Sequence, residues 1–153
     1  MPNRPVLHPN PDRALVLEGA ITYDLLEKLL LDIHRFKAAS QEPITLYIQS
    51  PGGHIEAADQ LLALIRSGAN PCPVVSVATT YTASAAALIL SQSDYAWAYP
   101  GCQLVYHGPR LNTGEMTREL AGDIQRNLGS KADDLARTFA LAIFSEPYED
   151  QTK

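Results

Sequence analysis

A serine and a histidine in this sequence stand where a nucleophile and its base could act. Ser84 lies in the run of small residues 79–87, directly after the β-branched stretch 74–78, and His107 ends the β-like run 103–107. A serine at a helix N-terminus gains from the positive end of the helix dipole, which stabilises alkoxide and oxyanion charge. Because serine alone is a poor nucleophile, it needs a base within hydrogen-bond reach. His107 is expected at the C-terminal end of a strand, which is where α/β sheets place functional groups.

A pair of adjacent glycines could supply the third part of such a site. The apolar run 44–48 ends in Pro51-Gly52-Gly53, and a helical pattern starts near Ile55. Two glycines let the backbone turn sharply and approach a ligand without a Cβ in the way. At the end of a strand, such a turn can direct N–H groups at a carbonyl oxygen and form an oxyanion hole.

Each of these features also has an ordinary structural interpretation. Gly-Gly after a strand is often only a tight connection, and Ser84 could simply cap or pack within its helix. His107 could be a hydrogen-bonded surface histidine. The three features therefore carry more weight together than singly.

The hydrophobic pattern predicts an α/β layer fold with a largely parallel sheet, because strand candidates alternate with helix candidates. Residues 74–78 form a continuous β-branched run, as expected for a parallel strand buried on both faces. Thr22 is a candidate N-cap for the first helix. The predicted strands are 14–17, 44–48, 74–78, 95–99 and 103–106, and the predicted helices cover 22–36, 55–66 and 83–90.

The C-terminal part carries a single apolar stripe over about residues 117–144. This pattern predicts one long helix bent at Gly129-Ser130, or a helical hairpin. Such a stripe has to pack on the body of the protein or on another subunit. Its members are Leu120, Ile124, Leu128, Leu135, Phe139 and Ile143.

Composition excludes several other classes of protein. The 153 residues, 46% hydrophobic and 19% charged, are typical of one globular domain. A net charge of −5 without any Lys/Arg cluster argues against nucleic-acid binding. No apolar run is long enough for a signal peptide or a membrane span, so we expect a cytoplasmic protein. Cys72 and Cys102 suggest neither a disulfide framework nor a metal site.

Three motifs in a fixed order carry a family resemblance. Residues 47–53, 83–85 and 105–107 together resemble the proteolytic subunit of the Clp protease, which has a strand ending in Asn-Ser-Pro-Gly-Gly, a nucleophile in Ala-Ser-Met-Gly and a base in a hydrophobic-hydrophobic-His-Gln-Pro run. The resemblance implies a ClpP/crotonase-like α/β fold of repeated β-β-α layers with a mainly parallel sheet and a long C-terminal handle helix. The four prolines among residues 1–12 predict a loose N-terminal arm. The resemblance implies a peptidase domain at 13–153 that lacks the last segment of the family fold.

The same resemblance implies roles for individual residues. Ser84 would be the acylating nucleophile and His107 the general base, with the backbone N–H groups of Gly53 and Ala85 as the oxyanion hole. By resemblance, the protein would be a homo-oligomer of stacked rings that hydrolyses unfolded polypeptides. An AAA+ ATPase unfoldase would deliver them, since the sequence has no phosphate-binding loop. No cofactor is expected.

The third member of a catalytic triad is not evident in the sequence. In the family an orienting aspartate follows the handle helix, near the position where this sequence ends. Asp150 is the nearest candidate, but its acidic surroundings are typical of a solvated tail. Lys131 could serve as the base of a serine–lysine dyad, although a surface charge is the simpler expectation. His54, after the Gly-Gly turn, could touch a substrate or be an ordinary first-turn histidine.

Two further functions remain open from the sequence alone. A crotonase-type enzyme acting on acyl-CoA would use a similar sheet and a paired-amide oxyanion hole, with carboxylates such as Glu56 moving protons. A catalytically impaired subunit that only shapes a ring beside active partners would account for the missing aspartate.

Overall fold

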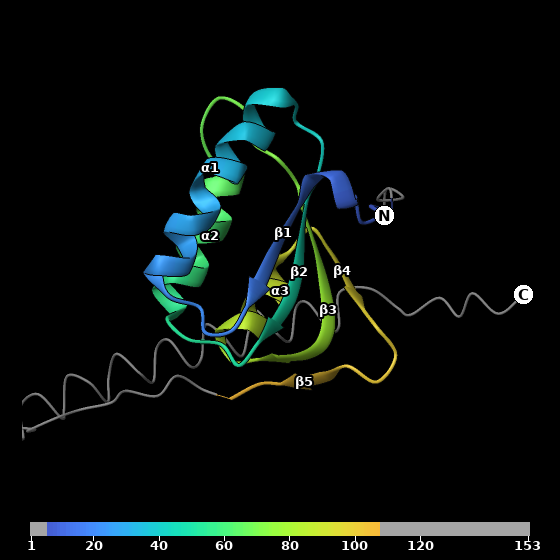
Figure 1. Ribbon diagram of the computed structural model, residues 1–153. Helices are drawn as coiled ribbons and strands as arrows, with labels where there is room; N and C mark the ends of the chain where they lie inside the picture. Colours follow the sequence, from blue (N-terminus) through green and yellow to red (C-terminus); the bar gives the residue numbers. More distant parts are fainter. Residues whose placement is uncertain (1–5, 108–153) are drawn as a thin grey trace, which may run out of the picture. The chain divides into compact units, whose positions relative to one another are not determined.

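The computed structural model describes residues 6–107, and the chain divides into two compact units, Met1–Tyr106 and His107–Lys153 (Figure 1). The expected handle helix, Lys131 and Asp150 lie outside the described residues. The elements of the first unit are η1 (Pro11–Arg13), β1 (Ala14–Glu18), α1 (Tyr23–Ala39), β2 (Ile44–Ser50), α2 (Ile55–Arg66), β3 (Val74–Ala83), α3 (Ala85–Gln92), β4 (Tyr95–Ala98) and β5 (Gln103–Val105).

The sheet confirms the predicted α/β class. Its strands follow the order β1-β2-β3-β4, β5 pairs with the far part of β3, and every pairing is parallel. Parallel neighbours need a crossover connection, and α1, α2 and α3 supply the three crossovers between β1 and β4. As a result, the C-terminal ends of β2 and β3 lie at the same edge of the sheet.

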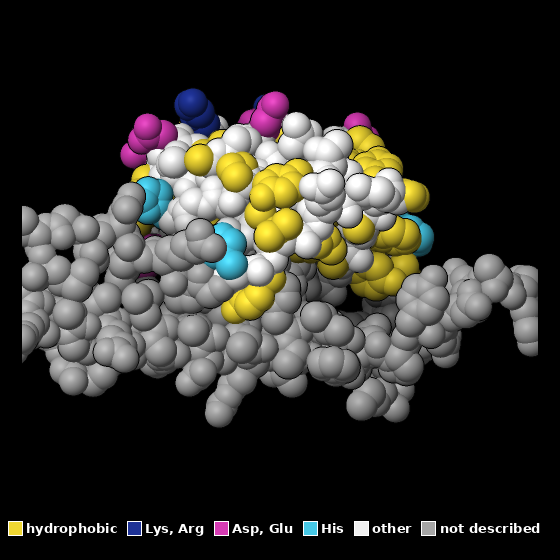
Figure 2. Space-filling view, turned by 90° about the horizontal axis from the view of Figure 1, so that it is seen from below, with side chains coloured by type: hydrophobic (Ala, Val, Ile, Leu, Met, Phe, Trp, Pro, Cys, Tyr) yellow, Lys and Arg dark blue, Asp and Glu magenta, His cyan; other side chains and the backbone are white. Residues whose placement is uncertain are grey.

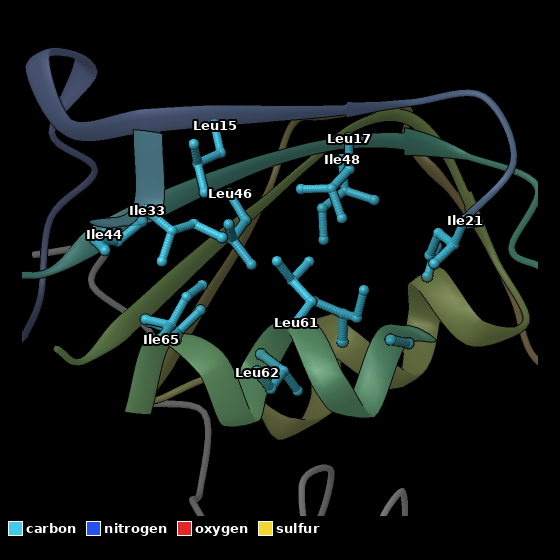
Figure 3. Packing of buried hydrophobic residues seen from close by; sticks show 14 of the residues in the cluster. Leu15, Leu17, Ile21, Ile33, Ile44, Leu46, Ile48, Leu61, Leu62 and Ile65 are labelled. Atoms are coloured by element: carbon cyan, nitrogen blue, oxygen red, sulfur yellow. The ribbon is translucent and has the colours of Figure 1, made fainter. Parts of the chain in front are cut away.

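The hydrophobic core lies between one face of the sheet and the helices (Figure 3). Helices α1 and α2 are amphipathic, and each turns its apolar stripe to this core, as the spacing predicts. Helix α3 is instead buried nearly all round, which agrees with its run of small and apolar residues. The largest fully buried core side chains include Leu15, Leu17, Ile33, Ile44, Leu46, Ile48, Ile65 and Ile89.

Strand β3 is longer than the sequence predicts. It was expected over 74–78 but continues to Ala83, and α3 accordingly begins at Ala85 rather than at position 83. The pairing partner of β3 changes along the strand. Val75–Ala78 pair with β4, whereas Tyr81–Ala83 pair with β5. This second pairing carries the chain directly to Ser84.

The described part of the N-terminal arm is held against the sheet, not loose as its prolines suggest. The indole Nε1–H of Trp97 donates to Leu7 O at 3.0 Å, and the His8 ring lies 5.6 Å from the Trp97 ring. The N–H of Asn10 donates to Thr45 Oγ1 at 2.8 Å. These contacts tie residues 7–10 to β2 and β4.

Within residues 6–107, none of the helices combines the length and apolarity needed to cross a membrane.

Candidate active site

The Gly-Gly turn after β2 packs directly against the turn that carries Ser84. A Cβ added to Gly52 would lie 2.6 Å from Ser84 Cβ, 2.7 Å from Ala83 O and 2.9 Å from Ala85 N. Contacts this short have no room for a side chain, so only glycine fits between the two turns. The structure thus packs Gly52, the neighbour of the predicted site residue Gly53, against the turn that holds Ser84 and Ala85.

Hydrogen bonds fix the Gly-Gly turn but leave one amide unused. The Gly52 N–H donates to Ser50 Oγ at 3.0 Å, and the His54 N–H donates to Ile21 O at 2.9 Å. Ile21 N–H in turn donates to Gly52 O at 2.8 Å, which forms an isolated parallel bridge between Ile21 and Gly53. No acceptor among residues 6–107 takes the N–H of Gly53, and Gly53 is an exposed residue. This amide is therefore available to a ligand.

Ser84 occupies a strained turn between β3 and α3. Its φ of 54° and ψ of −124° make it the only non-glycine residue with positive φ in the described part of the chain. Such a conformation costs about 1–3 kcal/mol and persists only where the surroundings enforce it. Ser84 is the N-cap of α3, yet its side chain makes no capping hydrogen bond. The interpretation of Ser84 as a helix-capping side chain is therefore wrong, and its hydroxyl is not consumed by the helix.

Ala85 is the first residue of α3, where a backbone N–H has no intrahelical acceptor. No other residue in the described region accepts this N–H either. The positive end of the helix dipole acts at the same place and favours negative charge. A hydroxyl on a sharp strand-to-helix turn beside unpaired amides is an arrangement suited to acyl transfer.

The position of His107 relative to Ser84 remains a prediction. The Ser84 N–H donates to Val105 O at 2.8 Å, so the start of α3 is tied to β5 two positions before this histidine in the sequence. His107 is partly buried, and it begins the second compact unit.

Two residues near the site have roles that the sequence analysis missed. Ser50 is buried, and its hydroxyl accepts the Gly52 N–H, which gives the Ser-Pro-Gly-Gly motif its turn. Its place two residues before a glycine was the available signal, because serine hydroxyls often close such turns. Tyr23 stacks on His54 at a ring distance of 5.6 Å, and His54 itself is exposed at the start of α2.

The surface around β5 is apolar. Figure 2 views the molecule from the β5 side and shows hydrophobic side chains gathered there. Exposed apolar residues of β5 and the adjoining end of β3 include Tyr81, Leu104 and Val105. Over residues 6–107, no three His, Cys, Asp or Glu side chains are grouped to hold a metal ion.

The described geometry and the motif order agree with the comparison against known families. A family model described as Clp protease matches residues 10–142, and the chain belongs to the Clp protease family. It is 31% identical over 135 residues to the ATP-dependent Clp protease proteolytic subunit 3 of Rhizobium meliloti, covering 85% of this chain and 66% of that protein. It is 28% identical over 99 residues to proteolytic subunit 2 of Pseudomonas aeruginosa, covering 63% of this chain and 48% of that protein.

A third relative is the ATP-dependent Clp protease proteolytic subunit of Paracoccus denitrificans, which is 29% identical over 108 residues. That match covers 69% of this chain and 53% of the relative. The chain thus spans between about half and two thirds of the length of these relatives.

Proposed function

We propose that this protein is a serine-type endopeptidase that hydrolyses peptide bonds of unfolded polypeptides. The observation that carries the proposal is the turn at Ser84. This serine has a strained backbone, its hydroxyl makes no capping hydrogen bond, and it packs against Gly52. The unpaired N–H groups of Gly53 and Ala85 belong to the same two turns. Membership of the Clp protease family supports the same reaction class.

In the proposed mechanism, Ser84 Oγ attacks the carbonyl carbon of the scissile bond while His107 takes its proton. The carbonyl oxygen becomes an oxyanion that accepts from the N–H groups of Gly53 and Ala85. The C–N bond then breaks, His107 gives the proton to the leaving amine, and an acyl-serine ester remains. Water attacks the ester with the same histidine as base, which releases the second product and restores the serine.

The substrate and the partners follow from the same proposal. The apolar surface that includes Tyr81, Leu104 and Val105 suits extended segments of polypeptide with apolar side chains. The relatives are named as ATP-dependent subunits, whereas the 153 residues here hold no phosphate-binding loop. We therefore propose a ring-forming homo-oligomer in the cytoplasm, served by an AAA+ ATPase unfoldase, with residues 13–153 as the peptidase domain and 1–12 as its arm.

A fluorophosphonate carrying a fluorophore tests the nucleophile directly. The full chain should be labelled at Ser84, because an activated serine displaces the fluoride from phosphorus. The label should disappear in Ser84→Ala and persist in Ser91→Ala. Ser91 is a matched control on the same helix, and its hydroxyl donates to Leu88 O.

Three results would contradict this function. An unlabelled wild-type protein would remove the serine nucleophile. Acyl-CoA turnover without peptide cleavage would favour the crotonase-type enzyme. An assembly with an active paralogue whose peptidase activity is unchanged by Ser84→Ala would favour a structural subunit.

A further inference from the structure

The pairing between β2 and β3 is interrupted just before both strands reach the site. Ile48 pairs with Ala78, but the next pair is Ser50 with Thr82, so residues 79–81 of β3 stand opposite Gln49 alone. At the end of this irregularity β3 pairs with β5, from Tyr81 to Ala83. The segment that leads to Ser84 is therefore not held to β2 by a continuous ladder.

Two threonine side chains span the interruption and converge on one oxygen atom. Thr79 Oγ1 donates to Ile48 O at 3.0 Å, and Thr82 Oγ1 donates to the same oxygen at 3.4 Å. Thr82 is 0% exposed. Because a buried hydroxyl needs a hydrogen-bond partner, its bond to Ile48 O satisfies it. Thr79 is the first residue after the pairing with Ile48 stops, and Thr82 is the residue at which pairing with β2 resumes. We call this pair of residues the threonine clamp.

The clamp joins the two halves of the candidate active site. Ile48 lies on β2 shortly before Ser50, whose hydroxyl sets the Gly-Gly turn, and Thr82 lies two residues before Ser84. We infer that Thr79 and Thr82 are positioning residues that hold Ser84 at a fixed place relative to the Gly53 amide. This inference rests on the proposed peptidase function.

Such positioning matters because acyl transfer tolerates little displacement. A misplacement of about 1 Å can cost roughly 10²-fold in rate. The strained backbone of Ser84 also has a tendency to relax, and only its surroundings prevent this. Residues 79 and 80 pair with neither β2 nor β5, whereas Tyr81–Ala83 pair with β5. Without the clamp, residues 79 and 80 would be free to shift, and the segment before Ser84 would lose its side-chain bonds to Ile48 O on β2.

The test compares valine and serine replacements in the full chain. Thr79→Val and Thr82→Val keep the branched shape but remove the hydroxyl, whereas Thr79→Ser and Thr82→Ser keep the hydroxyl. Fluorophosphonate labelling is followed as a function of probe concentration, so that the saturating rate is separated from the half-saturating concentration. We expect the saturating rate of the double valine variant to fall about 10–100-fold, with half-saturation changed less than about twofold. The serine variants should stay within about threefold of wild type.

A matched control removes another buried hydroxyl from the same strand. Ser76 lies toward the opposite end of β3, where its hydroxyl pairs with that of Ser93. Ser76→Ala should lower the thermal stability yet leave the saturating labelling rate unchanged, which separates positioning from general stabilisation.

A folded double valine variant that labels at the wild-type saturating rate would overturn the clamp. If the double variant does not fold, single Thr79→Val decides by the same criterion, because Thr79 is only partly buried. If the wild-type protein is not labelled at all, the proposed function fails and the clamp's role in catalysis fails with it. A labelled wild type with unaffected valine variants removes the clamp alone.

Discussion

The N-termini of α1 and α3 use the same functional group in opposite ways. Helix α1 starts at Thr22, whose backbone is extended and whose Oγ1 accepts the Leu25 N–H at 3.2 Å. Helix α3 starts at Ser84, whose backbone has positive φ and whose hydroxyl makes no capping bond. Both hydroxyls stand at the first turn of a helix that follows a strand, but only Thr22 supports its helix.

The difference shows what the chain gives up to keep a hydroxyl available for chemistry. A capping side chain is worth about 1 kcal/mol, and the strained backbone costs about 1–3 kcal/mol more. Helix α3 lacks the capping bond and bears the strain at Ser84, and the burial of the helix in the core compensates for both. This pattern is typical of a functional site, where local rules are broken and the rest of the fold offsets the cost.

Gly52→Ala should have the largest effect, because its Cβ would collide with the backbone and side chain of the Ser84 turn. We expect a loss of about 2–3 kcal/mol in the free energy of unfolding and a fall of at least about 10²-fold in fluorophosphonate labelling. Gly68→Ala is the control, since Gly68 also has positive φ, at +79°, but has no neighbour within 4 Å. It should cost about 1 kcal/mol from backbone strain and leave labelling intact. Equal effects of the two changes in urea unfolding would contradict the packing argument.

Ser50→Ala should have the next largest effect. It leaves the buried Gly52 N–H without its acceptor, which costs about 1–3 kcal/mol, and it loosens the turn that presents Gly53. Ser40 accepts the Glu42 N–H with the same spacing on the exposed surface. Ser40→Ala should therefore change stability by less than about 0.5 kcal/mol. Chemical denaturation at one protein concentration measures both variants.

Deleting the hydroxyls of Thr22 and Ser84 directly tests the difference between the N-termini of α1 and α3. Thr22→Ala should cost about 1 kcal/mol because it removes a cap. Ser84→Ala should cost less than about 0.5 kcal/mol because there is no capping bond to lose. A comparable loss for Ser84→Ala in urea unfolding would show that this hydroxyl supports the fold after all.

The last expected effect is a gain in stability relative to Ser84→Ala. Ser84→Gly should be about 0.5–1 kcal/mol more stable than Ser84→Ala, because glycine tolerates the positive φ. Ser91, in the last turn of α3 and without positive φ, should show the opposite order, with Ser91→Gly less stable than Ser91→Ala by up to about 0.5 kcal/mol. Thermal unfolding of the four variants checks the sign, and the same order at both positions would refute the strain at Ser84.

The overall fold was largely predictable because it depends on local hydrophobic patterns. The alternation of apolar strands with amphipathic helices predicted the parallel sheet, and the bounds of α2, Ile55–Arg66, agree with the predicted 55–66. Thr22 was identified as a cap because hydroxyl residues before an apolar helical stripe are a local signal.

The features that the sequence did not reveal depend on contacts between distant segments. The extension of β3 to Ala83 depends on pairing with β5, and the strand-favouring residues Thr79–Thr82 do not by themselves reveal that partner. The burial of Arg13 is another example. Its guanidinium donates to Phe36 O and Glu42 O, both at 2.9 Å, so backbone carbonyls some 23 and 29 positions away solvate the charge.

The candidate site falls between these two cases. Motif order predicted that the Gly-Gly turn and Ser84 would meet, and Gly52 packs against the turn that carries Ser84. The positive φ of Ser84 and the convergence of Thr79 and Thr82 on Ile48 O were beyond prediction, because both arise where strand pairing changes. The pairing of Ser84 with His107 stays a prediction.

Because the N-terminal arm is attached through Trp97, the fluorescence of this residue reports whether the arm is bound to the sheet. The sequence contains a single tryptophan, and its indole donates to the Leu7 carbonyl and contacts the His8 ring. Tryptophan emission, excited where tyrosine does not absorb, therefore comes from one known position on the sheet. Release of the arm, by a partner or by truncation, would expose the indole to water and shift that emission to longer wavelength without any added dye.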